Sequence, residues 1–151
     1  MFTDKIDYRM ELISAIEGNA SLKELNLSHC NLSERKTSVC DRPSVFEAFL
    51  SYIAGAYLLR NLDISHTGLS VQELVKLSEC LMGNPDQVEY LNIGYNALDH
   101  VHLKFTESNE MEDADNLTPQ EQFAENLAVY LEKSMKLVYL NMSGFFGLSQ
   151  H

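Results

Sequence analysis

The chain has 151 residues, of which 45% are hydrophobic and 22% are charged, and its formal net charge is −11. This composition is typical of one globular domain and excludes a disordered chain. The excess of acidic residues argues against nucleic acid and anionic membranes as partners, because both would repel it. No apolar run reaches the roughly 18 residues of a membrane span. We therefore expect a cytoplasmic protein, or a nuclear one.

The first predicted element is a helix at residues 3–18. Apolar residues recur there at helical spacing, and Gly18 follows as a stop signal. These apolar residues are Ile6, Met10, Ile13 and Ile16. The helix is expected to cover the first layer of the fold.

Four segments with one leucine spacing follow, starting near residues 22, 59, 88 and 137. The first is Leu22-Lys-Glu-Leu25-Asn-Leu27-Ser-His-Cys30-Asn-Leu32, and the next two repeat its spacing with Thr67 and Asn96 in the place of Cys30. The fourth is degenerate because Phe145 stands at that place and one extra residue precedes Leu148. Each segment predicts a short strand with its leucines turned inward.

Three helices are predicted between these segments, each beginning at a capping box, in which a hydroxyl and a carboxylate three residues later satisfy free N–H groups of the first turn. The boxes are Ser44 with Glu47, Ser70 with Glu73, and Thr118 with Glu121. Helical spacing then predicts the buried faces. These are Phe46, Phe49, Leu50 and Ile53; Leu74, Leu77 and Leu81; and Phe123, Leu127, Tyr130 and Leu131.

The repeated segments resemble the leucine-rich repeat, with its pattern LxxLxLxx(N/C)xL, and their alternation with helices resembles the ribonuclease-inhibitor type. The resemblance covers essentially the whole chain. It implies an α/β fold: one leucine-rich-repeat domain over residues 1–151, a short solenoid with a curved parallel sheet of about four strands and helices on the convex side. It also implies that Cys30 occupies the position of the small polar residue that bonds backbone groups in the bend after the strand.

Two inserted loops, 33–43 and 99–117, separate a strand from the next helix. Equivalent loops of a solenoid line up along one rim, so both are expected to project from the same edge. The second loop holds six acidic residues and one lysine. It is read either as a solvated acidic loop or as a docking element for a basic surface. A calcium site is a weaker alternative, because Asp113 and Asp115 have no following glycine and glutamate at the required spacing.

The residues between the consensus leucines are expected on the concave face, the usual recognition surface of a solenoid. In register they form rows across the strands. Amphipathic aromatic residues are favoured at interfaces, so we predict a protein-contact patch there. Its predicted residues are Tyr90, Tyr95, Tyr139, Asp63, Asn92, His29 and His66, with Phe145 and Phe146 at the C-terminal edge.

No metal site is predicted. His29 and His66 fall in register, but no third ligand is evident, and the pair His100 and His102 is an equally weak signal. Three cysteines without a CxxC spacing suit neither a disulfide framework nor structural zinc. Cys40, on the first inserted loop, is expected to be the most accessible thiol.

No motif of catalysis or cofactor binding occurs, so we predict no enzyme and no cofactor. The predicted function is a non-catalytic scaffold or adaptor that binds another protein, whose surface would be basic, through the concave face and rim loops. Alternatives are an inhibitor of a basic enzyme, a small-GTPase activator using Arg60 and Asn61, or a structural subunit. Phe145 and Phe146 either cap the last layer, or lie at an edge that meets another chain, in a homodimer or an assembly, or belong to a longer repeat array.

Overall fold

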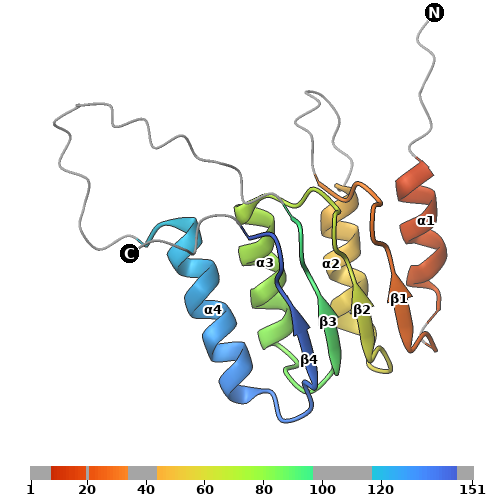
Figure 1. Ribbon diagram of the computed structural model, residues 1–151. Helices are drawn as coiled ribbons and strands as arrows, with labels where there is room; N and C mark the ends of the chain where they lie inside the picture. Colours follow the sequence, from red (N-terminus) through yellow and green to blue (C-terminus); the bar gives the residue numbers. More distant parts are fainter. Residues whose placement is uncertain (1–7, 20, 34–43, 97–116, 146–151) are drawn as a thin grey trace, which may run out of the picture.

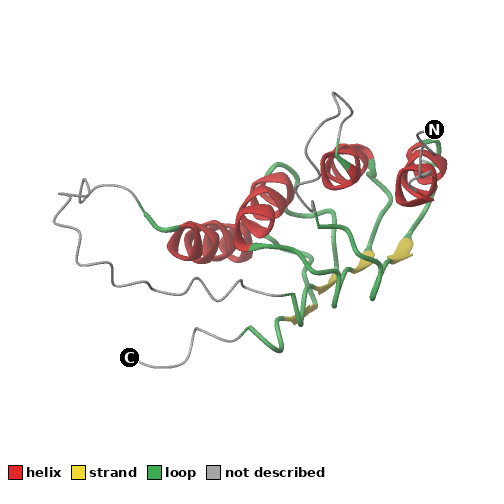
Figure 2. Cartoon of the chain, turned by 90° about the horizontal axis from the view of Figure 1, so that it is seen from above, coloured by secondary structure: helices red, strands yellow, loops and turns green. Residues whose placement is uncertain are grey.

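The computed structural model describes residues 8–19, 21–33, 44–96 and 117–145. They form four successive helix-strand units (Figure 1). The elements are α1 (Tyr8–Glu17), β1 (Glu24–Asn26), α2 (Val45–Gly55), β2 (Asn61–Asp63), α3 (Val71–Met82), β3 (Tyr90–Asn92), α4 (Pro119–Lys133) and β4 (Tyr139–Asn141). The strands pair in parallel in the order β1-β2-β3-β4. Figure 2 shows the helices along one side and the strands along the other. The predicted α/β leucine-rich-repeat solenoid is confirmed.

Local sequence signals define the helix starts. Ser70 and Thr118 form the complete capping boxes predicted for α3 and α4, and Pro119 opens α4. At Ser44 only one half of the box is present: its side chain accepts from the Glu47 N–H, and α2 follows. The first helix ends at Glu17, one residue before the predicted end, and residues 3–7 of the predicted span lie outside the described residues.

The core lies between the sheet and the helices and is built from the consensus leucines. Those of the second repeat are almost inaccessible: Leu59, Leu62, Ile64 and Leu69. The aromatic residues Phe46, Phe49, Phe123 and Tyr130 come from the helices to meet them. Leu131 was predicted in this core but is exposed, because the apolar stripe of α4 ends at Tyr130.

Burial decreases toward the two ends of the sheet. Leu22 and Leu25 at one end, and Leu137, Leu140 and Met142 at the other, occupy consensus positions but are only partly buried. The inner strands have a neighbour on both sides, whereas β1 and β4 have one. Among the described residues, no helix is long and apolar enough to cross a membrane.

Candidate protein-binding surface

The register of the sheet produces the predicted rows of side chains. Glu24, Asn61, Tyr90 and Tyr139 are mutual partners across the four strands. Asn26, Asp63, Asn92 and Asn141 form the next row. The residue three positions further along each chain segment lies in the turn after the strand, and these residues are His29, His66, Tyr95 and Gly144.

Aromatic side chains gather at the β3 and β4 end of this surface. Tyr90, Tyr95 and Tyr139 have exposed fractions of 46%, 50% and 49%. The rings of Tyr90 and Tyr139 lie side by side, with centroids 6.2 Å apart. At the other end of the same row the Asn61 amide donates to the Glu24 carboxylate at 3.2 Å. The structure thus brings the predicted tyrosines together on one exposed face.

Side chains of the second row form hydrogen bonds within the turns that follow the strands. In each repeat the Asn or Asp side-chain oxygen accepts from the backbone N–H two residues later, which is an Asx-turn. Asp63 accepts in this way from the Ser65 N–H at 3.0 Å and also from the Ser65 hydroxyl at 2.7 Å. Asn92 accepts from the Gly94 N–H and donates to Asp63 at 3.1 Å. Asp63 and Asn92, both predicted as contact residues, therefore have a structural role in the turns.

These hydrogen bonds set the protonation of Asp63. Burial is the largest single influence and would raise the pKa of this carboxyl. The bonds from the Ser65 backbone, the Ser65 hydroxyl and the Asn92 amide, with the charge of His29, outweigh it and lower the pKa. Asp63 therefore stabilises the fold in its ionised form.

Replacing Asp63 with asparagine, the residue found elsewhere in the row, should change how stability depends on pH. A carboxyl whose pKa is lowered on folding stabilises above its unfolded pKa of about 3.9, and this contribution is lost as pH falls through the folded value. Asp63→Asn should thus lose less stability than the wild type between about pH 5 and pH 2. Urea unfolding at a series of pH values measures this. Glu121, whose pKa the hydrogen bonds from Thr118 also lower, titrates in both proteins. Parallel pH curves for the two would contradict the prediction.

The third row is a stack of rings. His29 and His66 lie with their centroids 4.5 Å apart and nearly parallel, and Tyr95 stacks on His66 at 4.4 Å. All three adopt the left-handed backbone conformation, with φ of 63°, 54° and 55°. The next residue in the row, Gly144, has φ of 78°, and a Cβ built there would clash with the Tyr95 ring. One turn geometry, repeated at the strand spacing, therefore places the rings face to face.

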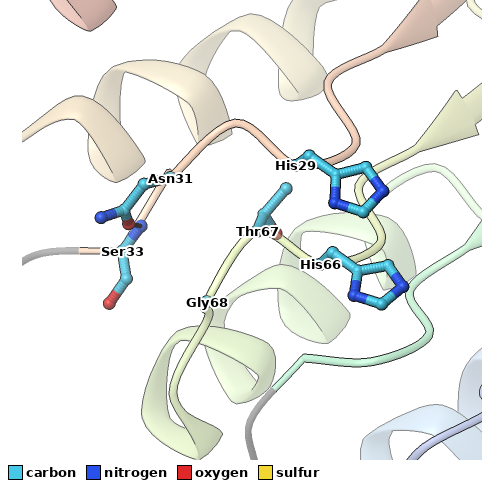
Figure 3. A pocket seen from close by; sticks show the side chains of 6 residues that line it. All are labelled: His29, Asn31, Ser33, His66, Thr67 and Gly68. Carbon is cyan, nitrogen blue, oxygen red and sulfur yellow. Dashed lines mark hydrogen bonds between the residues drawn. The ribbon is translucent and has the colours of Figure 1, made fainter.

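A small open pocket of about 270 Å³ lies beside the histidines (Figure 3). Its lining residues are His29, Asn31, Ser33, His66, Thr67 and Gly68. The two imidazoles lie side by side at one end of it, and Asn31 and Ser33 lie at the other (Figure 3). The part of the chain that the structure describes holds no group of three or more metal-ligating side chains. The stacked histidines are thus neighbours beside this pocket.

The small polar residue after the strand differs in burial and in hydrogen bonding from one repeat to another. Asn96 is buried and bonds the turn of the preceding repeat, as expected for this position. Cys30 lies in the turn after β1, before which the described residues hold no strand, and its side chain is exposed. The role implied for Cys30 is therefore not fulfilled. Cys40 lies outside the described residues.

Two polar residues connect neighbouring repeats in a way that the sequence analysis did not predict. The Gln87 amide is buried and donates to the Ile53 and Ala56 carbonyls at the end of α2. The Arg60 guanidinium donates to three carbonyls, including that of Gln87 at 3.0 Å, and pairs with Glu89 at 3.4 Å. Arg60 directly precedes β2, and Gln87 lies between α3 and β3. Each is a polar residue next to a consensus apolar residue, and that was the only signal available.

At the C-terminal edge Phe145 packs back onto the helices. Its ring is stacked on Phe123 of α4, with centroids 5.9 Å apart, and is partly buried against the core. Phe145 therefore covers part of the last layer. Phe146, the other aromatic residue predicted there, lies outside the described residues, as does most of the inserted loops 33–43 and 99–117.

Comparison with known proteins gives one match. No curated protein and no solved structure matches the chain. A family model of the leucine-rich repeat matches residues 21–41, which include the first strand and its consensus leucines. Together with the four parallel strands and their alternating helices, this match supports a leucine-rich repeat protein.

Proposed function

We propose that this chain is a non-catalytic scaffold or adaptor that binds another protein through its concave strand face. The observation that carries the proposal is the group of half-exposed tyrosines, Tyr90, Tyr95 and Tyr139, on neighbouring strands and turns. Leucine-rich repeat domains are generally non-catalytic modules that bind other proteins. Tyrosine supplies a large contact area with a polar end, at little cost in conformational entropy.

The charge of the same face supports a basic partner as part of this proposal. Among the described residues of its three rows, Glu24 and Asp63 are acidic and none is lysine or arginine. The whole chain carries a net charge of −11, which would accelerate encounter with a positively charged surface. We place the chain in the cytoplasm or the nucleus, and we assign its repeats to the ribonuclease-inhibitor type because of their strand-helix alternation.

Site-specific crosslinking tests where a partner binds. A photoreactive amino acid would replace Tyr90 or Tyr139 on the concave face, or Tyr57, an exposed tyrosine in the loop after α2, as the matched control. The proposal expects the same protein to be crosslinked from both concave positions and not from Tyr57. Crosslinking from position 57 alone would place the interface elsewhere and overturn the proposal.

Alanine substitutions then measure the energy of the contact. Hot-spot residues contribute about 2 kcal/mol or more, so Tyr139→Ala or Tyr90→Ala should weaken binding of the crosslinked partner about 30-fold. Isothermal titration calorimetry gives the dissociation constants, and Tyr57→Ala should leave them unchanged. An effect below about twofold for both concave variants would show that the tyrosines do not carry the binding.

Inhibition of a basic enzyme is a second candidate function, favoured by the acidic concave face. It expects an association rate that falls steeply with ionic strength, which stopped-flow measurements with the crosslinked partner would show. The small-GTPase alternative would use Arg60 or Asn61. The Arg60 guanidinium donates to the backbone carbonyls of Tyr57, Leu59 and Gln87, and the Asn61 amide donates to the Glu24 carboxylate.

A further inference from the structure

The two ends of the sheet present complementary hydrogen-bonding groups, and this complementarity follows from the repeat itself. Inside the molecule each strand is joined to the next by one recurring set of backbone bonds. In the first of these bonds, the N–H two positions after the central leucine of one strand donates to a carbonyl of the next strand. The bonds are Leu27 to Asp63, Ile64 to Asn92, and Ile93 to Asn141, at 2.8, 2.9 and 3.0 Å. In the second bond, a backbone N–H in the turn after the strand donates to a carbonyl in the next turn. These bonds are His29 to Ser65, His66 to Gly94 and Tyr95 to Ser143.

The return bonds are equally regular. The carbonyl of Lys23 accepts from the N–H groups of Arg60 and Asn61. In the same way, the Arg60 carbonyl accepts from the N–H groups of Glu89 and Tyr90. The Glu89 carbonyl accepts from the N–H groups of Val138 and Tyr139. Four backbone bonds of these types therefore connect every pair of adjacent repeats.

At β4 the same positions have no partner within the described part of the chain. The N–H groups of Met142 and Gly144 and the carbonyl of Val138 are equivalent to groups that bond the next strand in the inner repeats. At β1 the opposite members are free in the described residues: the N–H groups of Lys23 and Glu24 and the carbonyls of Asn26 and Ser28. The edge strands thus carry opposite halves of one bonding pattern, at opposite ends of the sheet (Figure 1).

The side chains at the two ends are complementary as well. Both ends expose consensus apolar residues that the inner repeats bury: Leu22 and Leu25 at β1, and Leu137, Leu140 and Met142 at β4. One position of the repeat holds Lys23, Arg60, Glu89 and Val138 in the four successive repeats. In the two inner repeats, Arg60 and Glu89 form an ion pair across neighbouring strands. A strand added to β4 would place its equivalent residue beside Val138.

We propose that a second copy of this chain adds head to tail, its β1 pairing in parallel with β4 and its α1 following α4, so that the solenoid continues across the junction. The contact reuses the interface that already joins the repeats. Such a contact is heterologous and does not close, so copies add in an open series. It leaves the concave face of each copy free and is independent of the proposed partner.

Charge substitutions at Val138 test this arrangement. In a head-to-tail junction Val138 lies beside Lys23 of the next copy, so Val138→Glu should strengthen the association and Val138→Lys should weaken it, each by about two- to fivefold. Adding Lys23→Glu to Val138→Lys should restore the association. Tyr57→Lys is the matched control, because Tyr57 and Val138 are both 71% exposed and Tyr57 lies away from both edges.

Removing an edge donor tests the backbone bonds. Glu24→Pro deletes one N–H of the β1 edge at the first residue of a strand, where proline is tolerated. It should raise the dissociation constant of the junction at least tenfold. Circular dichroism and a cooperative unfolding transition would show that each variant keeps the fold.

Sedimentation equilibrium of the full chain, at about 0.15 M salt, gives the outcome. The proposal expects a weight-average mass that rises with concentration past that of a dimer and responds to the variants as stated. A monomer at every concentration would overturn it. A mass that levels off at a dimer, with Val138→Glu and Val138→Lys acting in the same direction, would also overturn it by showing two-fold pairing.

Cysteine reactivity provides a second readout in the same samples. Cys30 is exposed at the β1 edge, at the position where the inner repeats bury Thr67 and Asn96. Its alkylation should slow as concentration rises, whereas that of Cys80, half-buried between α2 and α3, should not change. Equal rates for Cys30 in dilute and concentrated samples would count against the junction.

Discussion

Asn96→Ala should lower the free energy of unfolding by about 3–5 kcal/mol, because it leaves several buried backbone groups without partners. The Asn96 side-chain oxygen accepts from the backbone N–H groups of Thr67 and Leu69, both at 3.1 Å, and from the Thr67 hydroxyl at 2.9 Å. Its amide donates to the Ile64 and Ile93 carbonyls. Denaturation by urea, followed by circular dichroism, measures the change.

Asn26→Ala is the matched control for this prediction. Asn26 is the last residue of β1, is exposed, and within the described part of the chain accepts only from the N–H and hydroxyl of Ser28. Its loss should cost about 1 kcal/mol, since water replaces the missing acceptor. If the two variants were equally stable, the turns between repeats would not depend on the buried amide.

Gln87→Ala should destabilise the protein by about 2–3 kcal/mol, through two lost hydrogen bonds and the cavity left at a buried site. Gln87 is only 4% exposed, and its amide lies 3.0 Å from the Ile53 carbonyl and 2.8 Å from that of Ala56. Each carbonyl keeps one backbone donor, Ala56 and Leu59 respectively, which limits the loss. Thermal unfolding should therefore show a lower Tm.

Gln122→Ala tests whether the effect belongs to the buried position. Gln122 is exposed on α4 and donates to Glu79 at 3.4 Å, so its replacement should change stability by less than about 0.5 kcal/mol. A Gln87 variant as stable as the Gln122 variant would show that the end of α2 needs no side-chain donor.

The leucine spacing and the capping residues predicted most of the fold. Leu25, Leu62, Leu91 and Leu140 fall in register across the sheet as the pattern required. Helix starts at Ser70 and Thr118 followed from the local pairing of a hydroxyl with a carboxylate three residues later. These signals act over a few residues, so they can be recognised without knowledge of the tertiary structure.

The rows of the concave face were likewise determined by the sequence, because equal spacing within repeats places equal positions side by side. The tyrosines of β3 and β4 and the histidines of the first two turns are neighbours for that reason. What they bind was not determined, since a row of side chains fixes a surface and not its partner.

Only the tertiary structure decided whether residues at the same position of the repeat are buried or exposed. Cys30 and Asn96 occupy the same place in the repeat, yet one is exposed and the other is buried, because of the two only Asn96 has a preceding repeat among the described residues. Gln87 and Arg60 acquire their roles from carbonyls that lie far away in the sequence. A periodic sequence thus determines the repeating unit, whereas a residue's burial and bonding depend on whether a neighbouring layer is present.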